Sequence, residues 1–533
     1  MKKFYTFIPV ILMLLPISMV IDAANPVYTT PGDKKAYTLE SLSRIDSSGV
    51  EKIEDGVFTV TKDLQIAEVD TFILDNKATV KLGDAVVINI QGYGNLSVAD
   101  TAVITRINET VAPKGVYFNN SDKSYGSVEN VTFEYASLRY MGCKPLYAEN
   151  CTWIYSIGNL GSSSNASAVG FATTTGMNVI KNCRFISNQG PAVAGGANIA
   201  TALRFEGNYL YDNNTDNRNK PQINLNPGGN GAVEIINNTI EGTRRNMVGG
   251  IAVSNMLNTA GTNKVIIEGN KITDCRYGIT TMGALDVLIK DNVLIDNNAE
   301  TNPNNGGSGI NITDTGYTQT CMVTGNHIEG HLWGITIIGG KSVNVGKVEN
   351  ENAADFNPGG NSFKNNGNNG VLYDLYNNGK NTVYAQGNIW NVAQQTAEQI
   401  ATVIFDKADD EKLGEVIYMP AGSSNVTNLE EKAEKAVYNK VLAEIQLPAA
   451  GDVQVYSISG VCVAQATGVE TLPLSNLSRG VYVARTSFGT ISFVKKSTVN
   501  SIIKWWLALI SGANPILLMD EIFPKRKASL FIF

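Results

Sequence analysis

The chain has 533 residues, with 42 Lys and Arg against 49 Asp and Glu, so its formal net charge is −7. This acidic balance excludes a nucleic-acid binder that relies on a basic surface. The presence of only two histidines, His327 and His331, excludes catalysis centred on several histidines. There are 51 glycines and 58 asparagines, together about a fifth of the chain. Both residues disfavour helices, so the sequence predicts a protein poor in helix.

The N-terminus is typical of a secretory signal peptide. Lys2 and Lys3 precede an apolar run from Phe4 to Val20, and Asp22-Ala23-Ala24 offers small residues for cleavage. Residues 1–24 are therefore predicted to be removed on export. Six cysteines in so long a secreted chain do not indicate a disulfide framework.

Residues 25–127 are predicted to form an N-terminal cap and the first coils of a repeat structure. Four short segments in this region have the composition of strands, with apolar and β-branched residues. These segments are Val57–Val60, Thr71–Leu74, Val86–Ile90 and Ala102–Ile107.

Residues 128–420 contain an internal repeat. Each copy has an apolar residue, two spacers, Asn or Cys, one spacer and a second apolar residue, as in Ile267-Glu268-Gly269-Asn270-Lys271-Ile272. Successive copies are 20 to 35 residues apart. A constant strand-and-turn unit with variable connections predicts an all-β, right-handed parallel β-helix of about 10–13 coils, each stacked about 4.8 Å from the next.

The Asn of each copy has a predicted structural role. A side chain repeated at one turn can hydrogen-bond to its copy on the next coil and satisfy backbone groups of the turn. Cys151 and Cys183 replace Asn in two early copies and are predicted to be buried, unpaired thiols. A disulfide between them is geometrically possible if their coils are adjacent.

A second strand is predicted after each copy. Its outward residues carry little charge and are Asn224, Ala252, Thr280, Asn311, Thr336 and Leu372. The connections to this strand differ in length. Some are tight, and others are polar loops, such as Asp212 to Pro221 and Asp296 to Gly309. Loops inserted on one side of a solenoid are where binding faces usually lie.

The repeats resemble those of the pectate-lyase-like β-helix superfamily over roughly residues 50–420. The resemblance implies the fold but no particular activity, because that fold carries lyases, hydrolases, adhesins and proteins without known chemistry. In β-helix lyases, calcium held by carboxylates offsets the charge of the uronate and acidifies its C5 proton, and an Arg or Lys removes the proton.

The repeat register offers one set of residues for such chemistry. Asp212, Asp274 and Asp296 follow the last apolar residue of their copies by two positions and are candidate Ca²⁺ ligands. Arg244 and Arg276 follow by four positions and are candidate catalytic bases or uronate-binding cations. The alternative is purely structural, because Asp and Asn at turns bond their own backbone.

Four further residues are predicted to contact substrate. Asp216 and Arg218 lie in the inserted loop beside this column, and His331 and Trp333 lie in the tight turn that follows it. Trp333 could stack on a sugar ring or simply cap the core.

The C-terminal part changes in composition. Residues 421–446 are predicted to be a linker, and residues 447–497 a small β-sandwich with short strands separated by Gly. Val455-Tyr456-Ser457-Ile458-Ser459-Gly460 and Phe493-Val494-Lys495-Lys496 resemble the C-terminal sorting domains of type IX secretion in Bacteroidota. The resemblance implies passage through that secretion machinery, followed by release or attachment to the outer-membrane surface. Residues 498–533 depart from it, because such domains normally end the protein.

We therefore predict a secreted or surface protein that is a monomer and binds extracellular polysaccharide without demonstrated catalysis. The first alternative is a calcium-assisted uronate lyase or another glycan-degrading enzyme. The second is an adhesin that binds a protein partner.

Overall fold

The structure is a computed structural model that describes residues 25–157, 167–172, 176–195, 200–227, 231–258, 263–314, 316–340, 342–422, 436–439, 444–457, 461–478 and 480–495. The predicted signal peptide and the predicted C-terminal extension lie outside these residues, as does most of the predicted linker. The chain divides into two units, Met1–Ser424 and Asn425–Phe533. In the described segments, no helix has both the length and the apolar character needed to cross a membrane.

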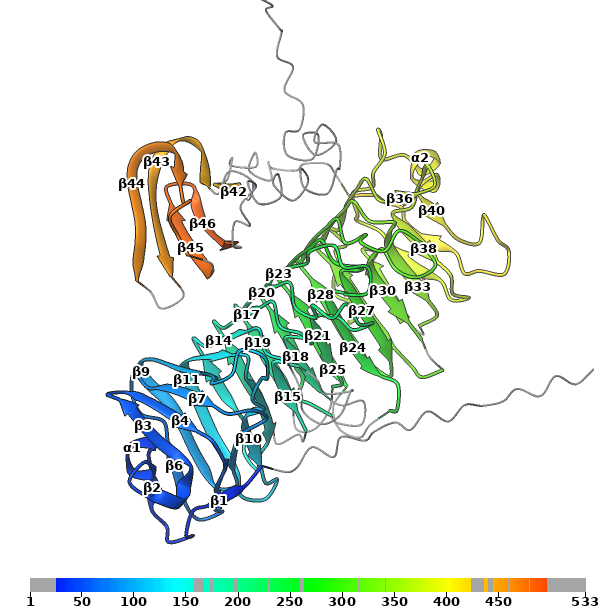
Figure 1. Cartoon of the computed structure of the whole chain (residues 1–533). Coiled ribbons are helices and arrows are strands. Elements are labelled where there is room, and N and C mark those ends of the chain that lie inside the picture. Colours follow the sequence, from blue (N-terminus) through cyan, green and yellow to red (C-terminus); the bar gives the residue numbers. More distant parts are fainter. Residues whose placement is uncertain are drawn as a thin grey trace, which may run out of the picture. The chain divides into compact units, whose positions relative to one another are not determined.

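The first unit is a right-handed parallel β-helix, which confirms the predicted fold (Figure 1). One face, sheet A, takes one strand from each coil and has fourteen strands. In order they are β1 (Val27–Thr29), β5 (Asp63–Ile66), β8 (Val87–Ile90), β10 (Gly115–Asn119), β12 (Ser137–Met141), β15 (Val169–Phe171), β18 (Val193–Gly195), β21 (Ile223–Leu225), β24 (Ile251–Asn255), β27 (Ile279–Gly283), β30 (Ser308–Thr313), β33 (Trp333–Ile338), β38 (Leu375–Asn377) and β40 (Ile404–Phe405).

The remaining strands of the solenoid form sheet B, which follows the other two sides of each coil. Its first run of strands is β2 (Ala36–Tyr37), β6 (Thr71–Ile73), β9 (Tyr93–Arg106), β11 (Tyr125–Glu134), β13 (Tyr147–Glu149), β16 (Asn178–Lys181), β19 (Leu203–Glu206), β22 (Val233–Ile236), β25 (Lys264–Glu268), β28 (Asp286–Lys290), β31 (Thr320–Thr324), β34 (Ser342–Gly346), β39 (Val383–Ala385) and β41 (Val416–Ile417). The second run passes through the later parts of β9 and β11 and contains β3 (Val50–Glu54), β4 (Val57–Val60), β7 (Thr79–Leu82), β14 (Thr152–Ile154), β17 (Arg184–Ile186), β20 (Tyr209–Tyr211), β23 (Thr239–Glu241), β26 (Lys271–Thr273), β29 (Val293–Ile295), β32 (His327–Glu329) and β35 (Ser362–Lys364).

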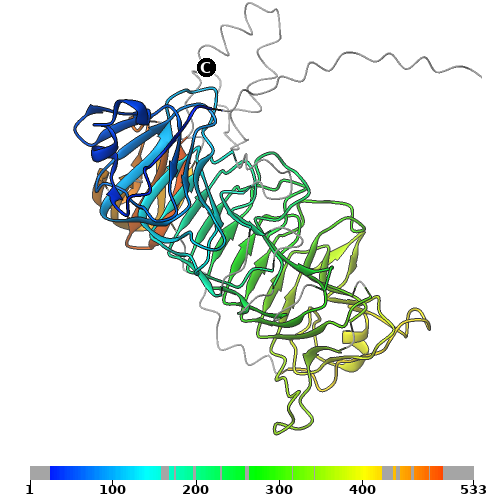
Figure 2. The ribbon, with the colours of Figure 1, turned by 90° about the horizontal axis from the view of Figure 1, so that it is seen from below.

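Short elements close the ends and edges of the stack. They are α1 (Leu39–Leu42) and the 3-10 turn η1 (Asp46–Ser48) near the start, the hairpin of β36 (Gly367–Asn368) and β37 (Val371–Leu372), and α2 (Ala397–Ala401) near the end. Figure 2 shows the coils from below, in chain order from blue to yellow. The interior is a column of buried apolar side chains, in which Trp153 stacks between Phe133 and Phe185 with ring centroids 5.2 and 4.9 Å apart.

The turn between the two runs of sheet B explains the repeat. The residue before each ladder position has a left-handed backbone, with φ between 53° and 71° from Asn182 to Gly387. Glycine, Asn and Asp adopt this conformation at the lowest cost, and they fill it here. The next residue points inward, and it is Asn from Asn208 to Asn388.

These asparagines form the predicted ladder. From Asn208 to Asn361, each Nδ2 donates to the Oδ1 of the next coil's Asn at 2.8 to 3.0 Å. Each backbone N–H donates to the same Oδ1 at 2.9 to 3.0 Å. Cys183 continues the column, because its N–H donates to Oδ1 of Asn208 at 2.9 Å. Cys151 and Cys183 are buried and unpaired, as predicted.

One predicted strand is in the wrong place. Val371–Leu372 is β37, which pairs with β36 in an exposed hairpin and takes no part in sheet A. The strand of that coil in sheet A is β38, so Tyr376 and not Leu372 follows Thr336 in the outward row. The hairpin is an insertion before β38, and β38 keeps the strand pairing of sheet A.

The second unit contains a small β region where the sequence predicts a β-sandwich, but its strands form a single sheet. Its strands are β42 (Val437–Asn439), β43 (Glu444–Ser457), β44 (Cys462–Pro473), β45 (Gly480–Thr486) and β46 (Gly489–Lys495), which form one antiparallel sheet. A separate small core that includes Val453, Val455 and Phe493 packs against it.

We expect Asn270→Ala to lower the free energy of unfolding by about 3 kcal/mol or more, because it leaves several buried backbone and amide groups without partners. Urea denaturation checks this value. The control is Asn352→Ala, at an exposed loop position, which should change the free energy of unfolding by less than about 0.5 kcal/mol. Equal effects of the two substitutions would contradict a structural role for the ladder.

Candidate functional site

The predicted aspartate column lies at the turn between sheet B and sheet A. Asp212, Asp274 and Asp296 all have left-handed backbones, with φ of 50°, 57° and 54°. Gly330 holds the same position on the next coil with φ of 76°, and a Cβ there would lie 2.1 Å from Oδ1 of Asp296. The aspartates therefore occupy a position that the turn itself requires. This agrees with the structural alternative given in the sequence analysis.

Asp212 is fully engaged by neighbours. Its carboxylate accepts bonds from Nε and Nη2 of Arg245 at 2.7 and 3.1 Å, and from the hydroxyl of Thr243 at 2.5 Å. The ion pair is partly shielded, with 16% of the Asp212 side chain exposed. The paired carboxylate raises the pKa of Arg245, chiefly through the hydrogen bond between them.

Arg244 spans the next two coils. Its Nη1 donates to Oδ1 of Asp274 at 3.2 Å and to the carbonyl oxygen of Asp296 at 3.3 Å, and its Nη2 donates to Oδ1 of Asn298 at 2.5 Å. Half of its side chain remains exposed. Arg244 is therefore a surface cation with one free side, and it already neutralises Asp274.

The three aspartates do not form one set of calcium ligands. Asp274 and Asp296 lie on adjacent coils, as expected, because Thr273 pairs with Ile295. Asp212 lies two coils before Asp274 and is held by Arg245. Across the described ranges, no three His, Cys, Asp or Glu side chains gather so as to hold a metal ion. We therefore derive no calcium-dependent step.

Arg276 connects two inserted loops. Its Nη1 donates to Oδ1 of Asn219 at 2.5 Å, its Nη2 donates to the carbonyl of Asn305, and its own carbonyl accepts the N–H of Gly307 at 2.8 Å. Its Nε is buried and has no hydrogen-bond partner. A side chain held on both sides in this way positions the loops and is poorly placed to remove a proton.

Asp216 and Arg218 pair with each other. The distance from Nη2 of Arg218 to Oδ2 of Asp216 is 2.7 Å. With Lys220, they line a cavity of only about 20 Å³, which has room for no sugar ring. Burial, with the nearby Arg218 charge, lowers the pKa of Lys220.

Trp333 lies in an aromatic cluster at the C-terminal end of sheet A. Its ring stacks on Tyr376 with centroids 5.0 Å apart and an interplanar angle of 25°, and it packs at 4.7 Å against Tyr373. Its Nε1 donates to the carbonyl of Pro303 at 2.9 Å. Phe405 continues the cluster edge-on to Tyr376. All four side chains are partly exposed, so the cluster is open to a ligand.

The outward row of sheet A leads into this cluster. Strand pairing places one residue per coil in the row, and over seven coils none is charged: Asn224, Ala252, Thr280, Asn311, Thr336, Tyr376 and Phe405. The members before Tyr376 are short, and Thr280 and Thr336 are only 6% and 7% exposed. Ala252 is 4% exposed as well, so the row is an uncharged strip of low exposure that ends in aromatic rings.

His331 is not on this surface. Its side chain is 1% exposed, and it belongs to a second interior ladder that runs along the turns before sheet A. Nδ1 of His331 lies 3.1 Å from Oδ1 of Asn366, and Nε2 lies 3.2 Å from Nδ2 of Asn297. The pattern fits a neutral ring that donates from Nδ1. Its burial argues against the predicted contact with substrate.

This second ladder is not apparent from the sequence because its members differ in residue type. Its chain of bonds uses Ser156, Asn188, Asn213, Gln222, Cys275, Asn297, His331, Asn366 and Asp374. The coil of Asn238 has no inward polar residue at this turn. The side chain of Gln222, from the preceding turn, fills the position and bonds to Asn213 and to the carbonyl of Glu241. A signal existed, since a polar residue directly follows the left-handed turn residue in most coils.

Asp374 ends the second ladder as a buried carboxyl group. It accepts bonds from Nδ2 of Asn366 at 3.2 Å and from the N–H of Asn391 at 2.8 Å. Burial raises its pKa to about 7, against the lowering effect of these two bonds. Burial also lowers the pKa of His331 to about 4.

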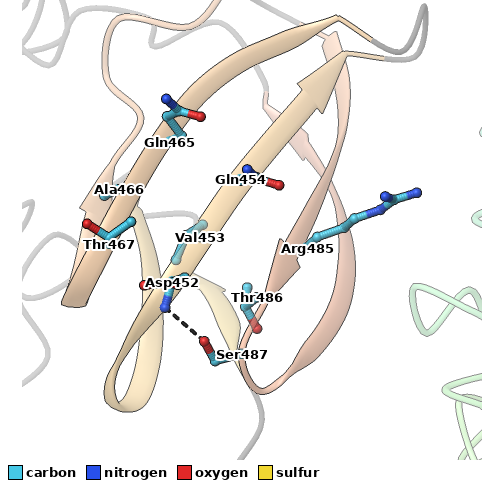
Figure 3. Close-up of a pocket in the computed structure, with 9 residues that line it drawn as sticks. All are labelled: Asp452, Val453, Gln454, Gln465, Ala466, Thr467, Arg485, Thr486 and Ser487. Carbon is cyan, nitrogen blue, oxygen red and sulfur yellow. Dashed lines mark hydrogen bonds between the residues drawn. The ribbon is translucent and has the colours of Figure 1, made fainter.

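The second unit has a hollow of about 570 Å³ on the outer side of its sheet (Figure 3). Gln465, Gln454 and Arg485 lie side by side on three strands and are exposed. The N–H of Asp452 donates to Oγ of Ser487 at 2.9 Å at one end. The hollow has one polar wall and contains no predicted site residue.

One protein-family comparison agrees with the fold. Residues 196–352 match the family described as "Right handed beta helix region". No curated protein matches the chain. Two matching solved structures are of the periplasmic alginate epimerase AlgG. A double mutant is 11% identical, with 73% of this chain and 83% of that chain covered and a TM-score of 0.41. A second structure is 12% identical, with 72% and 76% covered and a TM-score of 0.23.

The two buried titratable groups predict opposite dependences of stability on pH. The folded pKa of Asp374 is raised, so its contribution is full below about pH 4 and is lost as the pH rises through about 7. The folded pKa of His331 is lowered, so its contribution is full above about pH 6.5 and is lost as the pH falls through about 4. In the unmodified protein these two contributions largely offset each other.

The substitutions Asp374→Asn and His331→Asn separate the contributions of the two groups to the pH dependence of stability. Relative to the unmodified protein, the stability of Asp374→Asn should rise by about 4 kcal/mol between pH 4 and 7. That of His331→Asn, which restores the commonest ladder residue, should fall by about 3 kcal/mol between pH 4 and 6.5. Urea denaturation at several pH values measures both, and parallel curves for all three proteins would contradict the assignment.

Proposed function

We propose that this protein binds extracellular glycan chains on the outward face of sheet A, with Trp333 and Tyr376 as the stacking platform. The observation that carries the proposal is the partly exposed aromatic cluster at the end of an uncharged strip. Sugar rings present apolar C–H faces that pack on aromatic rings and hydroxyl groups that bond to small polar side chains.

The lack of charge on the strip favours a neutral glycan over a uronate. Recognition of a carboxylate uses Arg or Lys with free donors. Of the two predicted arginines, Arg276 is used between loops, and Arg244 is already paired with Asp274. The predicted signal peptide supports an extracellular location, and the sorting-like C-terminal segment supports transfer to the surface.

The structure supports binding better than catalysis. Several of the predicted charged groups already have partners: Asp212 is paired with Arg245, and Asp216 with Arg218. In both pairs the carboxylate is bound to an arginine, so neither pair offers a free acid or base for catalysis. The binding proposal therefore needs no bond-breaking step.

Binding of neutral and acidic polysaccharides to the full chain, measured by isothermal titration calorimetry, tests the proposal. Trp333→Ala and Tyr376→Ala should each weaken binding of a neutral glycan at least tenfold, about 1.4 kcal/mol. Tyr317→Ala is the matched control, since Tyr317 is an aromatic residue that is 39% exposed and outside the cluster. It should leave binding unchanged.

Three other outcomes would overturn the proposal. Failure to bind any glycan of a broad panel would favour a protein partner. Binding of acidic glycans alone, lost in Arg244→Ala but retained in Trp333→Ala, would move the site to the turn of Asp274 and Asp296. Release of unsaturated sugars that stops with a chelator would establish the lyase alternative.

A further inference from the structure

The two cysteines of the first ladder lie on consecutive coils. Strand β14 pairs in parallel with β17, with Thr152 opposite Arg184, so Cys151 and Cys183 hold the same position one coil apart. Their backbones are therefore separated by the coil spacing of about 4.8 Å. This spacing falls within the range of about 4.4 to 6.8 Å between Cα atoms that a disulfide spans.

The thiol of Cys183 also reaches the backbone of Cys151. The N–H of Cys151 donates to Sγ of Cys183 at 3.4 Å, so the sulfur of the later coil lies beneath the earlier residue. Both side chains are 1% exposed and point into the solenoid. The four remaining cysteines are Cys143, Cys275 and Cys321, at other positions of the solenoid, and Cys462 in the second unit.

We propose that Cys151 and Cys183 are a disulfide-forming pair, and that the dithiol seen here is its reduced state. In the reaction, each thiol loses its hydrogen and one Sγ–Sγ bond forms. A disulfide oxidant of the glutathione or protein-disulfide class accepts the two protons and two electrons that are released, and its own S–S bond breaks to give two thiols.

Burial sets the time at which this bond forms. Burial raises the pKa of the Cys183 thiol well above its ordinary value, with the neighbouring Cys151 adding to the effect. The thiolate is the reacting species, so in the folded protein both oxidation of the two thiols and reduction of their disulfide are slow. The bond forms while the coils assemble, and it is then shielded from reductants.

Refolding the full chain in a glutathione redox buffer, and separately in a reducing buffer, tests this proposal. Free thiols are alkylated under denaturing conditions, and peptides are analysed by mass spectrometry. Refolding in the redox buffer should give a peptide pair that joins Cys151 to Cys183 and lacks two hydrogens, with the other four cysteines alkylated. On reduction, the urea midpoint of this protein should fall.

Cys183→Asn is the informative variant, because Asn is the residue that the ladder uses on later coils. It should fold, form no cross-link, and show the same urea midpoint with and without reductant. Cys143→Ser is the control and should keep the cross-link. Complete alkylation of both cysteines after refolding in the redox buffer, or their capture only as separate glutathione adducts, would overturn the proposal.

Discussion

The amide-to-amide hydrogen bond between successive coils is the interaction on which the rest of this structure depends. A tight turn in each coil leaves inward backbone groups that no strand can satisfy, and burial makes each unpaired group costly. The Asn208–Asn388 column meets this need with one side chain per coil, which bonds to the turn below and the Asn above. Because the turn is fixed, the strands on either side meet in register, and the outward rows of sheet A follow.

Most of the fold could be predicted from the sequence, because the ladder demands one residue type. Asn supplies both a donor and an acceptor at a fixed reach, so the repeat from Asn208 to Asn388 is visible without any structure. The second ladder was hidden for the opposite reason. Its turn accepts any inward polar group, and His331, Gln222 and Cys275 satisfy it in different ways. The inserted β36–β37 hairpin displaced one strand assignment for a similar reason, since Val371 and Leu372 have strand composition but lie outside the coil.

The candidate site is less predictable, because its contacts depend on where long side chains extend and not only on how the strands are aligned. The sequence correctly places Asp274 beside Asp296. It does not reveal that Arg244 lies across both coils or that Arg276 is held between two loops, since long side chains choose their partners in three dimensions. Trp333 is a candidate from its residue type and its place in a tight turn, but its neighbours Tyr376 and Phe405 emerge only from the strand pairing. The outward row of low charge is visible in the sequence, whereas its aromatic end emerges only from the strand pairing.

The direction of the ladder bonds has a consequence for how such a chain changes over generations. Every coil from Asn208 onward offers a donor to its successor and an acceptor to its predecessor. Within the Asn ladder, a duplicated or deleted whole coil therefore meets matching partners at both new junctions. Gain or loss of part of a coil breaks both ladders at once. We infer that proteins of this design lengthen and shorten by complete turns, while the loops on the sheet A side vary freely in length.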